Sequence, residues 1–375
     1  MYKGKTIGVV VTAYDEAAFV GSVIETVPGF VDRIYVVEDD SPDESWRVIQ
    51  EVAERINDGE EPSPELAVTD GGDGRRVVPI RHEENRGYGA AVKTGYERAA
   101  ADDIDVVAVM NGDGQMDPAI LDRIVDPVVT GEADYAKGNR LLTREDREEM
   151  STFRFVGNAM LTGLSKFASG YWTIGDPQNG YTAISRETIE SLDLESITDQ
   201  YGFLNHILTH LNVDDRRVAD VSMSAVYGDE ESSIRYVPFI RYVSLLLLRS
   251  FLWRLKRQYV VEGFHPTVVF YGTGATGLAG GLAGALASLR GRTRDAASSG
   301  GAVAGLLASF VAVLVGLLAL GIAIAMDAAE NESLEVTRYE HGDEREDGDG
   351  DRVSDVVARN GGEWVASGGN DPPGR

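Results

Sequence analysis

The sequence predicts an α/β fold, in which a mainly parallel sheet with helices on both faces is followed by membrane-associated helices. Three observations predict this organisation. Short β-branched runs alternate with helical patterns over the first 110 residues, polar residues follow several of these runs, and two long uncharged stretches lie near the C-terminus. Strands that alternate with helices are joined by right-handed crossovers, which build a parallel sheet covered on both sides.

The strands and helices of the first domain can be assigned in order. Four apolar runs are predicted to be strands, namely residues 6–12, 33–38, 77–81 and 105–110. Helical patterns fill the intervals at 16–27, 43–56 and 87–100. The second of these helices opens with Ser41-Pro42-Asp43, which places proline in the first turn. Further helix and strand patterns complete a domain that we expect to cover residues 1–235.

The C-terminal part has a different character. Residues 236–260 mix Leu, Phe and Trp with Arg and Lys, which predicts an amphipathic helix in the membrane interface. The alternative is a core helix of the first domain. Residues 266–289 and 300–326 carry no charged side chain, and each is long enough to span a bilayer as a transmembrane helix. Residues 327–375 are acidic and poor in large apolar side chains, which predicts a disordered tail.

The distribution of basic residues predicts the orientation of this hairpin. Five Lys or Arg lie within residues 241–257, before the first apolar stretch, and three lie in the connector between the two stretches. The positive-inside rule then favours the cytoplasm for the first domain. We therefore expect a multi-pass protein of the cell membrane with a cytoplasmic domain 1–235.

Composition limits the classes of function. The net charge is −26, with 61 acidic residues against 35 basic ones, which argues against a surface for nucleic acid. Such an acidic surface is typical of a halophile, because it keeps a protein soluble when salt screens charge; an ordinary acidic protein is the alternative. The chain has no cysteine, which excludes disulfides, thiolate zinc sites and cysteine nucleophiles.

Polar residues follow three of the four predicted strands. They are TAYDE at 12–16, EDDSPD at 38–43 and NGDGQ at 111–115. The carboxyl ends of parallel strands meet at one edge of a sheet, where ligands usually bind. Asp113 stands between two glycines and can hold Mg²⁺ or Mn²⁺ against a diphosphate, although a simple turn aspartate is the alternative.

Six segments, in this order, resemble the motifs of family 2 glycosyltransferases of GT-A fold, and in particular the polyprenyl- or dolichyl-phosphate sugar synthases. They are TAYDE (12–16), IYVVEDDSPDES (34–45), NRGYGAAVKTGYERA (85–99), VAVMNGDGQMDP (107–118), KGNR (137–140) and DPQNGYT (176–182). The resemblance implies inverting transfer of a hexose from a UDP- or GDP-sugar to a polyprenyl (dolichyl) phosphate. That product would feed glycan or glycolipid assembly, including protein glycosylation. Transfer to a hydroxyl of a lipid-linked glycan or polysaccharide is the alternative, and a nucleotide-sugar-binding protein without activity is a third.

The resemblance also implies roles for individual residues. Asp113, Asp176 and Arg140 are the predicted catalytic residues, with Asp113 as the metal ligand and Asp176 as the base for a hydroxyl acceptor. The residues predicted to bind the donor are Tyr14, Asp15, Glu16, Asp39, Gly87, Asn111, Gln115, Gln178 and Arg235. The implied partners are the donor, the lipid acceptor and the bilayer, and a homo-oligomer is left open.

The sequence departs from the family pattern at several motif positions. Asn111 stands where the family has the first carboxylate of its D-x-D motif, Thr12 replaces a proline, and Asp15 replaces an asparagine. An asparagine brings no negative charge, so a metal would depend on Asp113 and on the diphosphate itself. Mg²⁺ accepts such an arrangement, with one carboxylate and phosphate oxygens.

Overall fold

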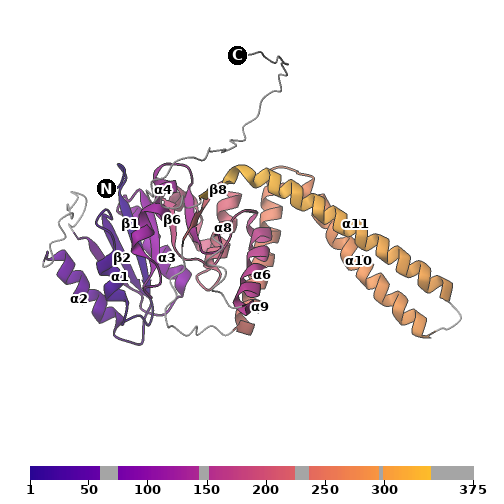
Figure 1. Cartoon of the computed structure of the whole chain (residues 1–375), viewed down its shortest axis with the longest axis horizontal. Helices are drawn as coiled ribbons and strands as arrows, with labels where there is room; N and C mark the ends of the chain where they lie inside the picture. The colour runs from indigo at the N-terminus through magenta and orange to yellow at the C-terminus, as the bar shows by residue number, and fades with distance from the viewer. Residues whose placement is uncertain (60–74, 143–151, 224–235, 295–298, 339–375) are drawn as a thin grey trace, which may run out of the picture. The chain divides into compact units, whose positions relative to one another are not determined.

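An eight-stranded sheet forms the centre of the computed structural model, which describes residues 1–59, 75–142, 152–223, 236–294 and 299–338 (Figure 1). The strands lie in the order β3-β2-β1-β4-β6-β5-β7-β8. Their bounds are β1 Ile7–Ala13, β2 Arg33–Glu38, β3 Val77–Arg81, β4 Val106–Asn111, β5 Tyr135–Asn139, β6 Thr182–Ser185, β7 Val218–Ser222 and β8 Glu335–Arg338. Only β6 runs antiparallel to its neighbours, β4 and β5, so the predicted mainly parallel sheet is confirmed.

Helices cover both faces of the sheet. Those of the N-terminal domain are α1 Val20–Thr26, α2 Ser45–Asn57, α3 Tyr88–Ala101, α4 Leu121–Val129, α6 Thr152–Ser169, α7 Arg186–Ser191 and α8 Phe203–Val213. Alternate residues of β1 point to opposite faces, as the pleat of a strand requires. Val9 and Val11 join one apolar cluster with α1, α2 and α4, whereas Val10 joins a second cluster with α3, α7 and α8.

Helix α9 (Tyr236–Lys256) packs against α6 and α8. Val243 and Leu247 are buried on that side, whereas Leu245 and Leu248 are about half exposed, at 48% and 53%. The helix therefore has one face on the domain and a second apolar face that no described residue covers. A helix was predicted here, with its basic residues at the membrane interface. Arg254 differs from that expectation, because its side chain is fully buried.

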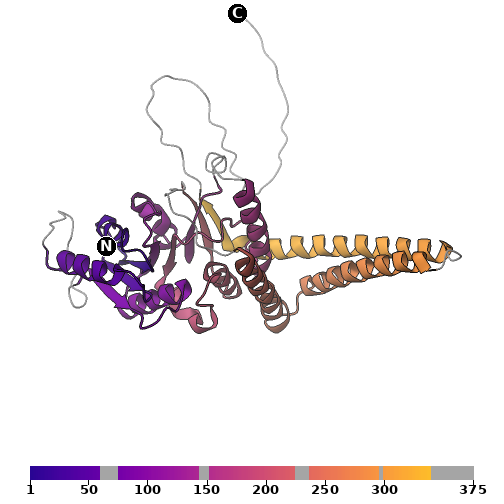
Figure 2. The same cartoon turned by 90° about the horizontal axis from the view of Figure 1, so that it is seen from below.

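Helices α10 (Thr267–Arg294) and α11 (Ser299–Asn331) run side by side in both views (Figures 1 and 2). Their backbones approach closely at glycines: a Cβ on Gly277 would lie 2.8 Å from the Cα of Gly316. Among the described residues, one helix, Gly301–Leu334, is long and apolar enough to cross a membrane, and its most apolar 18-residue window has a mean hydropathy of 2.7. Helix α10 is rich in Gly, Ala and Thr and does not reach the same apolarity, so the second span stays a prediction.

The predicted start of the disordered tail at residue 327 is wrong. Helix α11 continues to Asn331, a 3₁₀ turn covers Glu332–Leu334, and β8 pairs in parallel with β7. Composition misled the prediction because Asp327, counted as the first acidic residue of a tail, is fully buried and ion-paired to Arg254. Residues 339–375 lie outside the described part of the chain.

Candidate functional site

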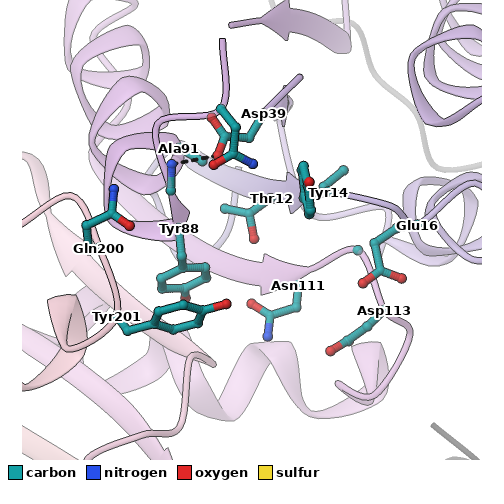
Figure 3. Close-up of a pocket in the computed structure, with 14 residues that line it drawn as sticks. Thr12, Tyr14, Glu16, Asp39, Tyr88, Ala91, Asn111, Asp113, Gln200 and Tyr201 are labelled. Atoms are coloured by element: carbon teal, nitrogen blue, oxygen red, sulfur yellow. Dashed lines mark hydrogen bonds between the residues drawn. The ribbon is translucent and has the colours of Figure 1, made fainter. Parts of the chain in front are cut away.

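A pocket of about 410 Å³ opens at the carboxyl ends of β1, β2 and β4 (Figure 3). Its lining residues are Thr12, Ala13, Tyr14, Glu16, Asp39, Asn85, Gly87, Tyr88, Ala91, Asn111, Gly112, Asp113, Gln200 and Tyr201. The strand register explains why distant motifs meet here, because Thr12 is paired with Asn111 and Ala13 with Glu38. The predicted convergence of three post-strand motifs at one sheet edge is confirmed.

The loop after β1 is held by the turn that precedes α2. The backbone N–H of Asp15 donates to Ser41 Oγ at 3.1 Å, and that of Glu16 donates to Ser45 Oγ at 2.9 Å. With residues 15 and 16 held in this loop, α1 begins at Val20, four residues later than predicted, and Glu16 lines the pocket. Asp15 has a φ of 62° and is exposed, and it does not line the pocket.

Asp39 is buried and fixes the beginning of α3. Its Oδ1 accepts the N–H of Arg86 at 2.9 Å and lies 2.6 Å from His82 Nδ1, while its Oδ2 accepts the N–H of Gly87 at 2.7 Å. Gly87 has a φ of 97°, a conformation that glycine adopts without strain. A carboxylate has about four lone pairs, so Asp39 keeps room for one further donor, such as a base N–H.

Carboxylate and amide groups gather at one end of the pocket, where Figure 3 shows Glu16, Asn111 and Asp113. Burial raises the pKa of Asp113, although hydrogen bonds from the Gln115 backbone and the Asn111 side chain oppose this. The buried Oδ1 of Asn111 has no hydrogen-bond partner among the described residues. Within the part of the chain that the structure describes, no cluster of three His, Cys, Asp or Glu side chains is suited to hold a metal.

Asp113 and Asn111 fit a divalent cation that takes most of its ligands from water and from a bound phosphate. Asp113 supplies a partly desolvated carboxylate, and Asn111 supplies an unsatisfied amide oxygen. Mg²⁺ is commonly held by one or two carboxylates together with water and phosphate oxygens. Gln115 contributes its backbone N–H to Asp113 Oδ1 at 3.0 Å and does not line the pocket.

A second cluster contains Asp176 and Arg140. Arg140 binds the buried Asp176 carboxylate with two N–H groups, Nε to Oδ2 at 2.8 Å and Nη2 to Oδ1 at 3.0 Å. Burial alone would raise the pKa of Asp176, but the hydrogen bonds and charge of Arg140, together with nearby Lys137, lower it. Asp176 is therefore an ionised and weakly basic carboxylate, and it has an unusual φ of 42°.

Lys137 holds the backbone that carries Asp176. Its buried Nζ donates to the carbonyl oxygens of Gly175 at 2.7 Å and Asp176 at 2.8 Å, and lies 3.7 Å from a carboxylate oxygen of Asp220. Burial lowers the pKa of Lys137, and Asp220 opposes that shift. The sequence motif KGNR thus supplies both a backbone support, Lys137, and the partner of Asp176, Arg140.

Residues 176–180 connect the Asp176 cluster to the pocket. A Cβ on Gly180 would lie 2.7 Å from the Tyr88 hydroxyl and 3.3 Å from Asn111 Oδ1, so only glycine allows this approach. Gln178 is half-buried, and its Nε2 has no partner among the described residues, but it does not line the pocket. The predicted contact of Arg235 with phosphate lies outside the described residues.

Among the pocket residues that were not predicted as site residues from the sequence are Tyr88, Gln200 and Tyr201. Figure 3 shows them at the end of the pocket opposite Asp113. Gln200 donates from Nε2 to the carbonyl oxygen of Arg86 at 3.0 Å, which brings the loop before α8 against the start of α3. No motif marks Gln200 or Tyr201, whereas Tyr88 lies inside the NRGYG segment, which the family resemblance includes.

Comparison with known proteins gives consistent results. Residues 8–193 match the model of glycosyl transferase family 2. The UDP-N-acetylglucosamine–dolichyl-phosphate N-acetylglucosaminyltransferase of Methanococcus voltae is 23% identical over 226 residues, which cover 60% of this chain and 87% of that protein. The polyprenol monophosphomannose synthase of Mycolicibacterium smegmatis is 29% identical over 199 residues, or 52% and 67% of the two chains. A solved structure, glucosyl-3-phosphoglycerate synthase from Mycobacterium tuberculosis, has 22% identity and a TM-score of 0.44, and the match covers 67% of this chain and 80% of that one.

Proposed function

The chain belongs to glycosyl transferase family 2 and is a glycosyltransferase, and we propose that it transfers a hexose from a nucleotide-sugar to a polyprenyl (dolichyl) phosphate at a membrane surface. Relatives named for dolichyl-phosphate and polyprenol sugar transfer support the acceptor class. The observation that carries the proposal is the continuity between the pocket-bearing sheet and the apolar helix α11, whose end returns to that sheet as β8.

The pocket supports a nucleoside diphosphate sugar as donor. Asp39 offers a spare acceptor for an N–H of the base, and both UDP- and GDP-sugars present such an N–H. Asn111 and Asp113 would hold Mg²⁺ or Mn²⁺ beside the diphosphate, and such an ion neutralises charge that builds on the leaving group. Glu16 completes the polar end of the pocket.

The reaction requires one bond to form and one to break at the anomeric carbon. An oxygen of the acceptor phosphate attacks that carbon, the bond to the diphosphate breaks on the opposite face, and the nucleoside diphosphate leaves with the bonding electrons. Attack from the opposite face inverts the anomeric configuration. Arg140, half-buried beside Asp176, is the proposed phosphate-binding residue of this cluster, because guanidinium groups bind phosphate oxygens with charge-assisted hydrogen bonds.

The state of Asp176 favours a phosphate acceptor over a hydroxyl. A hydroxyl acceptor needs a general base, and an effective base has a pKa near the working pH. Arg140 instead holds the pKa of Asp176 below its ordinary value, which makes this carboxylate a poor proton acceptor. A lipid phosphate is already an anion at neutral pH and can attack without losing a proton to the protein.

The fold supports an even number of membrane crossings. Helix α10 begins after α9, which packs on the domain, and α11 ends in β8, which is hydrogen-bonded into the same sheet. If α11 crosses the bilayer, α10 must cross it too, because both ends of the hairpin lie with the domain. The 34 residues of Gly301–Leu334 extend about 50 Å as a helix, which exceeds the roughly 30 Å hydrocarbon core. The basic residues flanking the hairpin favour a cytoplasmic domain.

A transfer assay tests the proposal. Membranes in molar salt are supplied with dolichyl phosphate and with labelled UDP- or GDP-sugars, with and without EDTA, beside Asp113→Asn and the control Asp103→Asn. Asp103 is exposed in the turn before β4, at the sheet edge opposite the pocket. We expect a chloroform-soluble product that needs both the metal and Asp113. Donor hydrolysis without lipid product would indicate a hydroxyl acceptor, and no turnover of any donor would contradict the proposal.

A further inference from the structure

Residues 327–338, the return segment, follow the apolar part of α11 and bind the loop 172–176 that leads to Asp176. Glu335, the first residue of β8, accepts the backbone N–H of Trp172 with Oε1 at 2.6 Å and that of Thr173 with Oε2 at 2.5 Å. The Thr173 hydroxyl also donates to Glu335. One carboxylate therefore holds two successive peptide groups that lie three and four residues before Asp176.

A second carboxylate of the same segment reaches this loop. Asp327, near the end of α11, is fully buried and forms a two-pronged ion pair with Arg254 of α9, with both N–O distances at 2.8 Å. The indole N–H of Trp172 donates to the same carboxylate at 3.2 Å. Tyr259 and Tyr271 add hydroxyl bonds at 2.5 and 3.2 Å, so α9, α10, α11 and the loop share one hydrogen-bond network.

The far end of the loop is fixed by the Asp176 support. Asp220 accepts the N–H of Gly175 at 2.9 Å, and Lys137 donates to the carbonyl oxygens of Gly175 and Asp176. Residues 172–176 are thus held at one end by the return segment and at the other by the sheet. Asp176 has a positive φ, a conformation that persists only where the surroundings enforce it.

We propose that Glu335 and Asp327 are positioning residues of the transfer site, through which residues 327–338 set the place of Asp176 and Arg140. The proposal rests on the function proposed above for this site. It assigns to the hairpin a role besides anchoring, because the part of the chain that follows α11 also holds the loop that leads to Asp176. Neither residue touches the pocket, so both act through the loop.

The kinetic test uses Glu335→Gln, which keeps the shape of the side chain and removes its charge, and Glu335→Ala. The matched control is Glu332→Gln, an exposed residue of the same return segment. We expect kcat for the lipid acceptor to fall about 10- to 100-fold in Glu335→Ala, since displacements near 1 Å cost about that much. The Kd of the nucleoside diphosphate should stay unchanged, because its pocket is built by other loops. The glutamine variant should lie between alanine and the wild type.

Amide hydrogen exchange supplies a readout that does not depend on turnover. In the full-length protein, Glu335→Gln should speed exchange in peptides that cover residues 170–176, and Glu332→Gln should leave it unchanged. Unchanged exchange in both variants would overturn the inference, whether or not the wild type transfers sugar to lipid. Faster exchange with an unchanged kcat would also overturn it, because the contact would then be structural alone. A wild type that shows no lipid product would count against the proposed function, while the exchange data would still test the contact.

Discussion

Asp39 and Asp15 provide a direct test of how the pocket holds the donor. The family motifs assign both residues to the nucleotide, but in the structure only Asp39 lines the pocket. In Asp39→Asn, the amide oxygen can keep the bonds to Arg86 and His82, whereas the amide NH₂ then faces the N–H of Gly87. The 2.7 Å bond to Gly87 is lost, and two donors oppose each other at the start of α3.

The size of the effect follows from that single bond. A hydrogen bond to a charged group contributes about 1.5–3 kcal/mol, and leaving a buried donor unsatisfied costs a similar amount. Gly87 lines the pocket, so the nucleotide can bind only after the loop at Gly87 has returned to its wild-type conformation. The free energy needed for that change is subtracted from the binding free energy of the nucleotide. About 1.4 kcal/mol corresponds to tenfold in Kd, so we expect Asp39→Asn to weaken donor binding about 10- to 100-fold.

Isothermal titration calorimetry with UDP and GDP in molar salt measures this Kd for both variants. Asp15→Asn should change it less than about twofold, because the side chain is exposed and asparagine also accepts a positive φ. Thermal melting of both variants checks that the fold is retained. Equal weakening by the two substitutions would refute the reasoning, since it would place Asp15 in the binding site despite its position outside the pocket.

Three further predictions concern the cation, the hairpin and its orientation. Because burial raises the pKa of Asp113, the transfer rate should fall on acidification with a midpoint above the pKa of an ordinary aspartate. Added Mn²⁺ should move the midpoint of this pH–rate profile downward. Gly316→Ala should lower the melting temperature of the solubilised protein, because its Cβ would lie 2.8 Å from the Leu278 nitrogen, and overpacking of this kind costs about 1–3 kcal/mol. The control Gly321→Ala should leave the melting temperature unchanged, because a Cβ there meets nothing within 4 Å. In this cysteine-free chain, an impermeant maleimide applied to inverted vesicles should label Glu332→Cys and spare Thr293→Cys; the reverse pattern would contradict a cytoplasmic domain.

Much of the pocket could be predicted because its parts follow strands. In a parallel sheet the carboxyl ends lie at one edge whatever the intervening chain does, so Glu16, Asp39 and Asp113 could be grouped before their distances were known. Gln200 and Tyr201 could not be grouped this way, because they precede a helix and reach the pocket only through contacts with the start of α3. Such a contact depends on tertiary packing and leaves no periodicity in the sequence.

The return segment was mispredicted for a different physical reason. Composition treats each charged residue as a group that needs water, so Asp327 marked the beginning of a tail and Arg254 marked an interfacial helix. The structure instead pairs these two residues, 73 positions apart, with hydrogen bonds to both carboxylate oxygens. A buried charge is tolerated when a partner and further donors satisfy it, and sequence composition cannot identify that partner.

The Arg254–Asp327 pair also clarifies what holds the hairpin to the domain. Buried ion pairs often add little net stability compared with apolar residues of the same size, because desolvation offsets their attraction. Their directional bonds nevertheless accept few alternative arrangements, and here they join α9, the start of α10 and the end of α11. An apolar cluster and the β7–β8 pairing also join the hairpin to the domain, and this network adds directional bonds that restrict its register. If the acceptor arrives from the plane of a membrane, the site must lie at a fixed height above that membrane. The residues at the end of α11 would then set this height, because Asp327 binds both Arg254 and the loop at residues 172–176.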